Sequence, residues 1–215
     1  STADVKKCIG PKTKVIDLNG KRMLPGFIDN HTHFMSGGFQ LQSVDLRTAR
    51  NETEFANLIR QRAEKHPDRW ITGGDWDHDN WPGGNLPTKE LIDQYTISTP
   101  VFVQRYDGHM ALANSKALKL AGVDKNTPDP QGGTIVRDKK TGEPTGVLKD
   151  AAMSFVYAKV PDPSEREMIE AARLGLAEAR KYGVTSIQDV SSGQDVRVYQ
   201  MLRNRTADDA PESRR

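Results

Sequence analysis

The sequence at Pro25–His33 reads PGFIDNHTH, an apolar run that ends in two histidines separated by one residue. The Pro-Gly start and the apolar residues after it indicate a buried strand. Side chains at i and i+2 of a strand point to the same side, so His31 and His33 are expected to project together from its carboxyl end. α/β sheets place their active sites at that edge. Two imidazoles at this spacing can bind one metal ion such as zinc, iron or nickel. The alternative is two surface histidines at a strand end.

Short β-rich runs alternate with helical stretches on both sides of this motif. Strands are expected at residues 15–18, 26–29, 70–72, 101–103 and 184–187, and helices after the N-cap residues Asn51, Asn114 and Ser164. Turn residues between two β-rich runs near residues 132–150 predict a β-hairpin. The repeated order of strand, helix and strand favours a parallel α/β sheet or barrel.

Composition excludes several classes of protein. The 215 residues suit one ordinary domain or a slice of a larger one. Lys and Arg number 31 against 29 Asp and Glu, a net charge of +2, so no charge excess points to nucleic acid or to an anionic membrane. No apolar run approaches the roughly 18 residues of a membrane span. The single cysteine, Cys8, excludes an internal disulfide. We expect a cytoplasmic protein that binds neither nucleic acid nor a membrane.

His109 is a further candidate for chemistry. It follows the apolar run at residues 101–103, and Gly108 beside it allows a tight turn. A histidine at such a strand end could donate a hydrogen bond to a substrate carbonyl. The alternative is a histidine bonded to a neighbouring loop, and Asp107 is interpreted as a turn former.

The stretch Trp76–Trp81 reads WDHDNW and brings together acids, a histidine and two indoles. The indoles, Trp76 in particular, are expected to form an apolar wall that contacts the substrate. His78 is the weaker candidate for a metal ligand, because it has no helical or strand spacing to partners. Asp189 ends the last predicted strand, where a place at the barrel mouth and a structural role are both open.

Four separated motifs resemble one family. They are LPGFIDNHTH at Leu24–His33, GDWD at Gly74–Asp77, YDGHMALANS at Tyr106–Ser115 and TGVLKD at Thr145–Asp150. Together they resemble the amidohydrolase superfamily, and within it the amidohydrolase 3 branch that includes N-substituted formamide deformylases. The resemblance runs from about Ser1 to Arg203. It implies a distorted TIM-type (β/α)₈ barrel and a small β-sandwich built from both chain ends.

The resemblance also implies roles for individual residues. The family's metal site uses the His-x-His pair, a later carboxylated lysine, two later histidines and a late aspartate, and only His31 and His33 correspond to it here. We therefore expect a divalent metal, zinc, at this pair. His109 is expected to bind the substrate and to act in catalysis. Asp150 is expected to be a catalytic pocket residue, since similar sequences carry Asp or Glu there.

The expected fold is α/β, with three segments. Residues 1–24 are interpreted as the remnant of the sandwich, residues 25–203 as the first half of the barrel with the hairpin inserted near 132–150, and residues 204–215 as a disordered or foreign tail. We expect a metal-dependent amidohydrolase that cleaves a non-peptide C–N bond with metal-activated water, and a chain that is truncated and inactive alone. A non-catalytic partial domain with weak metal binding, an esterase or lactonase on the same fold, and a homodimer of the complete protein stay open.

Overall fold

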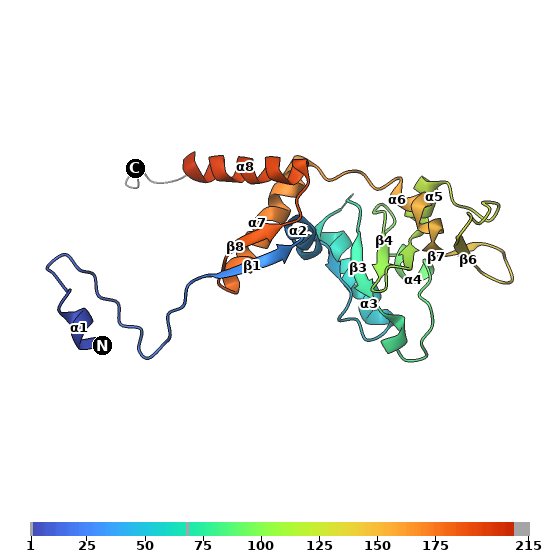
Figure 1. Cartoon of the computed structure of the whole chain (residues 1–215). Helices are drawn as coiled ribbons and strands as arrows, with labels where there is room; N and C mark the ends of the chain where they lie inside the picture. The colour runs from blue at the N-terminus through green and yellow to red at the C-terminus, as the bar shows by residue number, and fades with distance from the viewer. Residues whose placement is uncertain (1, 68, 209–215) are drawn as a thin grey trace.

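The computed structural model describes residues 2–67 and 69–208, which form a mixed α/β structure with two separate sheets. One is a two-stranded parallel sheet of β1 (Phe27–Thr32) and β8 (Val184–Asp189). The other has six strands in the order β2-β3-β4-β5-β7-β6 and belongs to a compact lobe. Figure 1 shows the small sheet between the N-terminal segment and this lobe. The chain between β1 and β8 therefore builds the lobe before it returns to β1.

The lobe combines parallel and antiparallel pairing. Strands β2 (Val44–Asp45), β3 (Gly73–Trp76) and β4 (Phe102–Arg105) are parallel to one another, whereas β5 (Met110–Ala113), β7 (Pro144–Asp150) and β6 (Gly133–Arg137) continue the sheet antiparallel. Its helices are α3 (Glu52–Lys65), α4 (Glu90–Asp93), α5 (Ser115–Ala121) and α6 (Ser154–Tyr157). The hairpin expected near residues 132–150 is confirmed as β6 and β7.

Local signals in the sequence explain the helices of the lobe. The side chain of Asn51 accepts a hydrogen bond from the N–H of Glu54 at 2.8 Å, which caps α3 as predicted. Phe55 and Ile59 of α3 are fully buried in a core that also holds Trp76. Burial of one apolar face thus fixes the helix against the sheet.

Asn114 caps α5 and also joins two loops. Its side-chain oxygen accepts from the N–H groups of Val101 and Ala117 at 3.0 and 2.9 Å. Its amide nitrogen donates to the carbonyl oxygens of Thr96 and Thr99 at 3.1 and 2.9 Å. The residue is 0% exposed, so water cannot replace these bonds.

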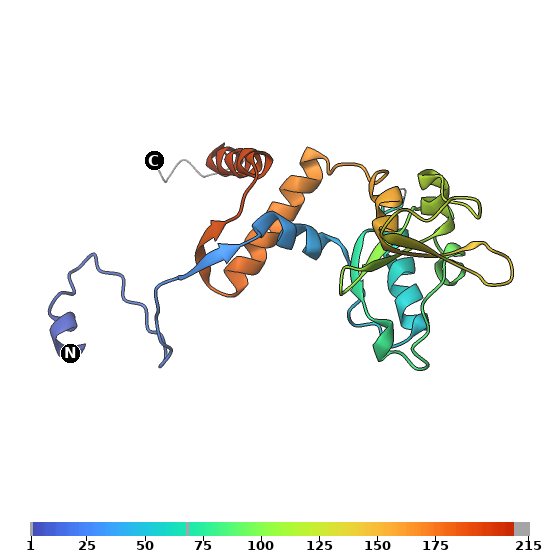
Figure 2. The same cartoon turned by 45° about the vertical axis from the view of Figure 1, so that its right-hand side comes forward.

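Three helices accompany the β1–β8 sheet, namely α2 (Phe34–Gln42), α7 (Glu165–Lys181) and α8 (Gly193–Asp208), and α7 contacts β8 and both other helices. Figure 2 shows α2 crossing α7. The two helices can approach closely because Gly38 has no side chain. A Cβ at this position would lie 2.3 Å from the carbonyl oxygen of Ala171. A Cβ at Gly175 would lie 2.9 Å from the ring of Phe34. The predicted capping box of Ser164 and Glu167 starts α7.

The structure corrects two expected strands. Val15–Leu18 is exposed chain without strand pairing, because no neighbouring strand lies beside it to complete a ladder. Before it, α1 covers Thr2–Lys6. The assignment of residues 1–24 to a sandwich remnant stays a prediction. The strand expected at residues 70–72 begins later, at Gly73, and only Ile71 forms an isolated bridge, to Val101.

Two larger expectations also change. Residues 25–203 were expected to form the first half of the barrel with one hairpin inserted; in the described chain β1 pairs with the distant β8, and the intervening strands lie in a separate sheet. Residues 204–208 belong to the segment interpreted as a disordered or foreign tail; they are helical, since α8 continues through Asp208, and Val198 and Leu202 of the same helix are buried. Residues 209–215 lie outside the described part of the chain.

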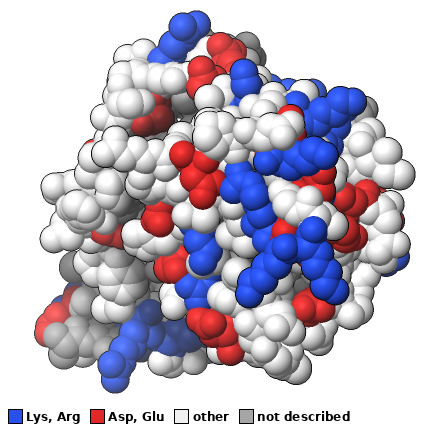
Figure 3. Space-filling view, turned by 90° about the vertical axis from the view of Figure 1, so that its right-hand side faces the viewer, with Lys and Arg blue, Asp and Glu red and all other residues white. Residues whose placement is uncertain are grey.

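Both signs of charge lie close together on the face of the lobe seen in Figure 3, where Lys and Arg are interleaved with Asp and Glu. Among the described ion pairs of the lobe, Arg47 pairs with Asp45 at 2.8 Å, with side chains 58% and 49% exposed. Exposed pairs of this kind contribute little to stability. None of the helices that the structure describes has the length and apolar composition needed to cross a membrane.

Replacing Asn114 by alanine should destabilise the lobe strongly. The substitution removes a helix cap and leaves buried backbone groups of Val101, Thr96 and Thr99 without partners. The expected loss is about 3 kcal/mol of unfolding free energy. Asn51→Ala is the matched control, because it removes an N-cap that is only half-buried and should cost about 1 kcal/mol. Urea denaturation of both variants checks this, and equal losses would contradict the role assigned to Asn114.

Candidate functional site

The predicted histidine pair lies at the carboxyl end of β1. His31 is in the strand, and His33 occupies the N-cap position of α2. Their ring centroids are 5.4 Å apart with the rings nearly perpendicular. Both residues are exposed, and within residues 2–67 and 69–208 neither imidazole has a hydrogen-bond partner. The two rings therefore lie side by side, as strand alternation predicts, with their nitrogens available to a ligand.

Asp189, at the end of β8, holds this strand end in place. Its carboxylate accepts hydrogen bonds from the N–H of Phe34 at 2.6 Å and from the hydroxyl of Tyr199 at 2.7 Å. It also accepts from Thr32 Oγ1 at 3.2 Å and from Ser191 Oγ. The bonded residues Thr32 and Phe34 flank His33 on both sides. The sequence left the role of Asp189 open, and the structure shows that it anchors the motif.

These contacts also determine the charge of Asp189. Burial alone would raise the pKa of its carboxyl, but the hydrogen bonds from Phe34, Ser191, Tyr199 and Thr32 outweigh burial and lower the pKa below its ordinary value. Burial, followed by the bond to Asp189, raises the pKa of the Tyr199 hydroxyl. The pair therefore stays as carboxylate and neutral phenol at physiological pH.

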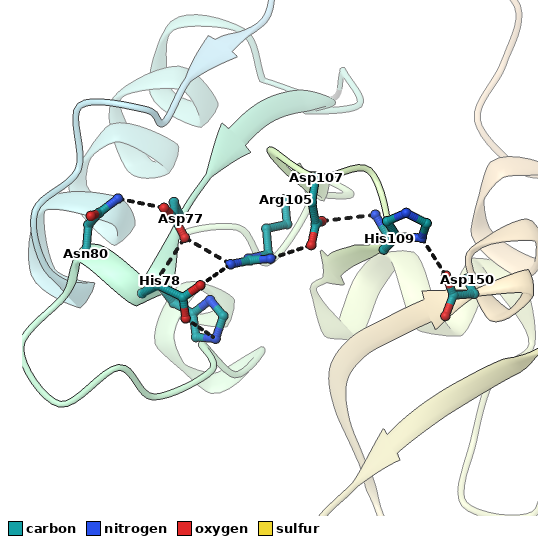
Figure 4. A network of polar contacts seen from close by, with 8 residues as sticks. Asp77, His78, Asn80, Arg105, Asp107, His109 and Asp150 are labelled. Carbon is teal, nitrogen blue, oxygen red and sulfur yellow. Dashed lines mark hydrogen bonds and ion pairs between the residues drawn. The ribbon is translucent and has the colours of Figure 1, made fainter.

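His109 and Asp150 meet at the far end of the β5–β7 ladder. Met110 pairs with Lys149, and the N–H of Asp150 donates to the carbonyl oxygen of His109 at 2.9 Å. The side chains meet as well, with His109 Nδ1 2.9 Å from Asp150 Oδ1. Figure 4 shows this contact. His109 and Asp150 were predicted from the sequence as separate candidates, and in the structure their side chains are in contact.

Two features distinguish this pair from an ordinary surface contact. The hydrogen bond and the charge of Asp150 raise the pKa of the His109 imidazole above its usual value. Asp150 has φ 49° and ψ −123°, a backbone region that favours glycine. Such a conformation costs about 1–3 kcal/mol and is frequent at functional sites. The pair nevertheless remains accessible, with His109 and Asp150 side chains 74% and 53% exposed.

Arg105, at the end of β4, lies between Asp77 and Asp107 in a network of carboxylates (Figure 4). Its side chain is only 8% exposed. The guanidinium donates to Asp77 at 3.1 Å and also to Asp79 and Asp107. Asp107 in turn accepts the backbone N–H of His109 at 3.0 Å, as a turn former does.

Asp77, His78 and Asp79 form a second group that could hold a metal, since their ligand atoms lie within 4.8 Å of one another. However, the guanidinium of Arg105 already pairs with both carboxylates. A metal ion would have to share these acids with a buried cation, which like-charge repulsion disfavours. The imidazoles of His31 and His33 fit a metal better, because among the described residues neither ring takes part in a hydrogen bond or an ion pair.

Trp76 does not form a pocket wall in this structure. Its side chain is 0% exposed, its Nε1 donates to the carbonyl oxygen of Val103 at 2.9 Å, and its ring packs edge-on against Phe55. The apolar indole is buried and its N–H is satisfied, so the residue belongs to the core. A contact between Trp76 and a substrate stays a prediction that this geometry does not favour.

Comparison with known proteins identifies the family. Residues 14–212 match the Amidohydrolase family (Amidohydro_3). The chain belongs to this family. The match extends beyond Arg203, where the resemblance was expected to end, and takes in most of the segment that was interpreted as a tail.

Three relatives illustrate the similarity. The chain is 44% identical to Protein LONG AFTER FAR-RED 3 of Arabidopsis thaliana, over 88% of this chain and 32% of that protein. It is 34% identical to Putative amidohydrolase YtcJ of Bacillus subtilis, over 87% and 36% of the two chains. N-substituted formamide deformylase of Arthrobacter pascens is 32% identical over 86% and 35%. The chain thus spans about a third of the length of these relatives.

Two solved structures of metal-dependent hydrolases are similar to this chain in fold. An uncharacterized metal-dependent hydrolase from Pyrococcus horikoshii superposes with a TM-score of 0.63 at 25% identity, covering 95% of this chain and 38% of that one. A metal-dependent hydrolase from Pyrococcus furiosus gives a TM-score of 0.61 at the same identity.

Asp150→Asn should lower the pKa of His109 towards the ordinary value of about 6.5. The amide keeps the shape of the carboxylate but not its charge. Because the folded-state pKa is raised, the pair stabilises the fold below the unfolded-state pKa, and this contribution is lost as pH rises through the folded-state value. An NMR titration of the imidazole checks this. Asp138→Asn, in the turn of the same hairpin, is the control and should leave His109 unchanged; an unshifted pKa in Asp150→Asn would contradict the pairing.

Proposed function

We propose that the protein to which this chain belongs is a metal-dependent hydrolase that cleaves a non-peptide C–N bond, of the amide or formamide type, in a small molecule. Membership in the Amidohydrolase family supports the reaction class. The relative named N-substituted formamide deformylase supports the type of bond. The observation that carries the proposal is the pair of adjacent, exposed imidazoles of His31 and His33.

His31 and His33 are the residues that would hold the metal, and zinc suits imidazole ligands. When bound, a divalent metal supplies Lewis-acid activation of water and of a carbonyl group. Tight zinc sites have three or four protein ligands. Two imidazoles alone therefore make a weak site, and we propose that further ligands come from parts of the complete protein other than these 215 residues. Asp189 orients the pair by fixing Thr32 and Phe34 on either side of His33.

We further propose that β1 and β8 are neighbouring strands of a TIM-type barrel, and that the six-stranded lobe is inserted between them. Parallel pairing across a long connection is the arrangement that such barrels use. The exposed Phe27 and Ile28 of β1, 56% and 67% accessible, are apolar side chains that further barrel elements could cover.

His109 and Asp150 are proposed to act on the substrate. Because Nδ1 of His109 is bound to Asp150, the other ring nitrogen, Nε2, is left to face a ligand. The raised pKa favours the doubly protonated imidazole, in which Nε2 donates a hydrogen bond. Such a donor can stabilise negative charge that develops on a carbonyl oxygen.

A non-catalytic role with weak metal binding is the second candidate. It is favoured by the placement of the two groups on different sheets: the imidazole pair lies at the carboxyl end of β1, whereas His109 and Asp150 lie at the β5–β7 ladder of the lobe. One relative, 32% identical, is named Exoenzymes regulatory protein AepA. A substrate panel of amides, formamides, esters and lactones, assayed with the complete protein, separates the two candidates.

In the complete protein, His31→Ala should remove both metal and turnover. His109→Ala should lower kcat by ~10²–10³ while metal content stays unchanged, because it removes a hydrogen-bond donor and no ligand. His66→Ala, which follows α3 and lies outside both groups, is the control. Metal analysis and kinetics on the same preparations check this, and an unaltered kcat in His109→Ala would exclude that residue from the reaction.

The 215-residue chain should bind zinc weakly and lose it on dialysis. His31→Ala and His33→Ala should each abolish the binding, because a single imidazole is a poor site. Isothermal titration calorimetry measures the affinity, with His66→Ala as the matched control. Stoichiometric zinc that survives dialysis would show that other residues of this chain complete the site.

A further inference from the structure

Arg105 is the cation of a network whose carboxylates come from two separate turns. Asp77 and Asp79 belong to the turn after β3, and Asp107 belongs to the turn between β4 and β5. One terminal nitrogen of the guanidinium contacts Asp77 and Asp79, while the other contacts Asp107 (Figure 4). The planar fork of arginine thus ties one turn to the other.

The second of these turns presents His109. The N–H of Gly108 donates to the carbonyl oxygen of Arg105 at 3.0 Å, and Gly108 has φ 77°, which glycine adopts without strain. Oδ1 of Asp107 accepts the N–H of His109 at 3.0 Å, while its other oxygen faces Arg105. The carboxylate of Asp107 therefore connects the guanidinium directly to the backbone of His109.

On its other side, His109 contacts Asp150 of β7 through the ring. A 2.9 Å contact between two exposed side chains is easily lost if the histidine backbone moves. Because the His109 and Asp150 side chains are 74% and 53% exposed, their packing contributes little to holding the His109 backbone. What holds the backbone is the β5–β7 ladder on one side and the Asp107–Arg105 connection on the other.

We propose that Arg105 is a positioning residue for His109: anchored by Asp77 and Asp79, it fixes Asp107 and thereby holds the His109 imidazole against Asp150. The inference rests on the proposed function only in that His109 is proposed there to act on the substrate. The guanidinium is largely removed from water, since the Arg105 side chain is 8% exposed, and its ion pairs are therefore screened less than those at the surface. A lysine at this position would keep the charge but offers a single nitrogen, which cannot replace the fork.

The test measures how strongly Asp150 affects the pKa of His109. The quantity is the fall in the pKa of His109, followed by NMR, that Asp150→Asn causes in a given background. It is measured in the otherwise unchanged chain, in Arg105→Lys and in Asp107→Ala. Because each value is a difference within one background, the general effect of a changed charge at residue 105 or 107 cancels.

Arg137→Lys provides the matched control. Arg137 of β6 is also a clamped arginine, which donates to Asp129 at 2.6 Å and to the carbonyl oxygens of Ile135 and Thr127, but it does not contact the turn of His109. Protection of the β4–β5 amides against hydrogen exchange shows in each variant that the lobe is folded. Asp107→Ala is the variant of lower risk, since Asp107 is partly exposed and Arg105 keeps two carboxylates.

In Arg105→Lys and Asp107→Ala the effect of Asp150→Asn should be at least about twofold smaller than in the unchanged chain, while Arg137→Lys should leave it unaltered. The amide of His109 should also exchange faster in the first two variants. An undiminished effect in both would overturn the proposal, as would an equal loss in Arg137→Lys. The titration needs no turnover, so the positioning role can fail while the proposed hydrolase activity stands, and the reverse.

Discussion

The parallel pairing of β1 with β8 is the constraint on which the rest of the structure depends. Ile28 lies opposite Ser186, and Thr32 lies opposite Asp189, although more than 150 positions separate the partners. This register places the carboxylate of Asp189 where it accepts hydrogen bonds from residues on both sides of His33. Without the pairing, His31 and His33 would have no common support.

Helix packing reinforces this pairing. Helix α2 starts directly after the histidine motif, and α7 ends just before β8. Close approach at Gly38 and Gly175 locks the two helices together, so the chain enters and leaves the lobe at neighbouring points. The lobe can then close its own core around residues such as Phe55 and Trp76 without disturbing the β1–β8 pair.

Local features were predictable from the sequence because they depend on neighbouring residues. The caps at Asn51 and Asn114 are examples, and so is the common direction of His31 and His33. Long-range pairing was not predictable, because strand partners are decided by register and by packing that no short pattern encodes. Val15–Leu18 has strand composition but no neighbour.

In the candidate site, too, individual residues were predictable from the sequence, whereas the contacts between them were not. His109 and Asp150 could be proposed individually, but their contact depends on the register of β5 against β7. Trp76 is a residue type that is common in pocket walls, yet its indole is fully buried in the core. No sequence motif predicts the role of Arg105, because the three carboxylates that it contacts come from two turns that are distant in the sequence.

The most direct test of this account is a measurement of nuclear Overhauser effects between backbone protons of β1 and β8. The register predicts contacts between Ile28 and Ser186 and between Asp29 and Ile187. Contacts between Phe102 and Ala113 inside the lobe serve as the internal reference. If the lobe contacts are present and the β1–β8 contacts are absent, the support proposed for the histidine pair does not exist.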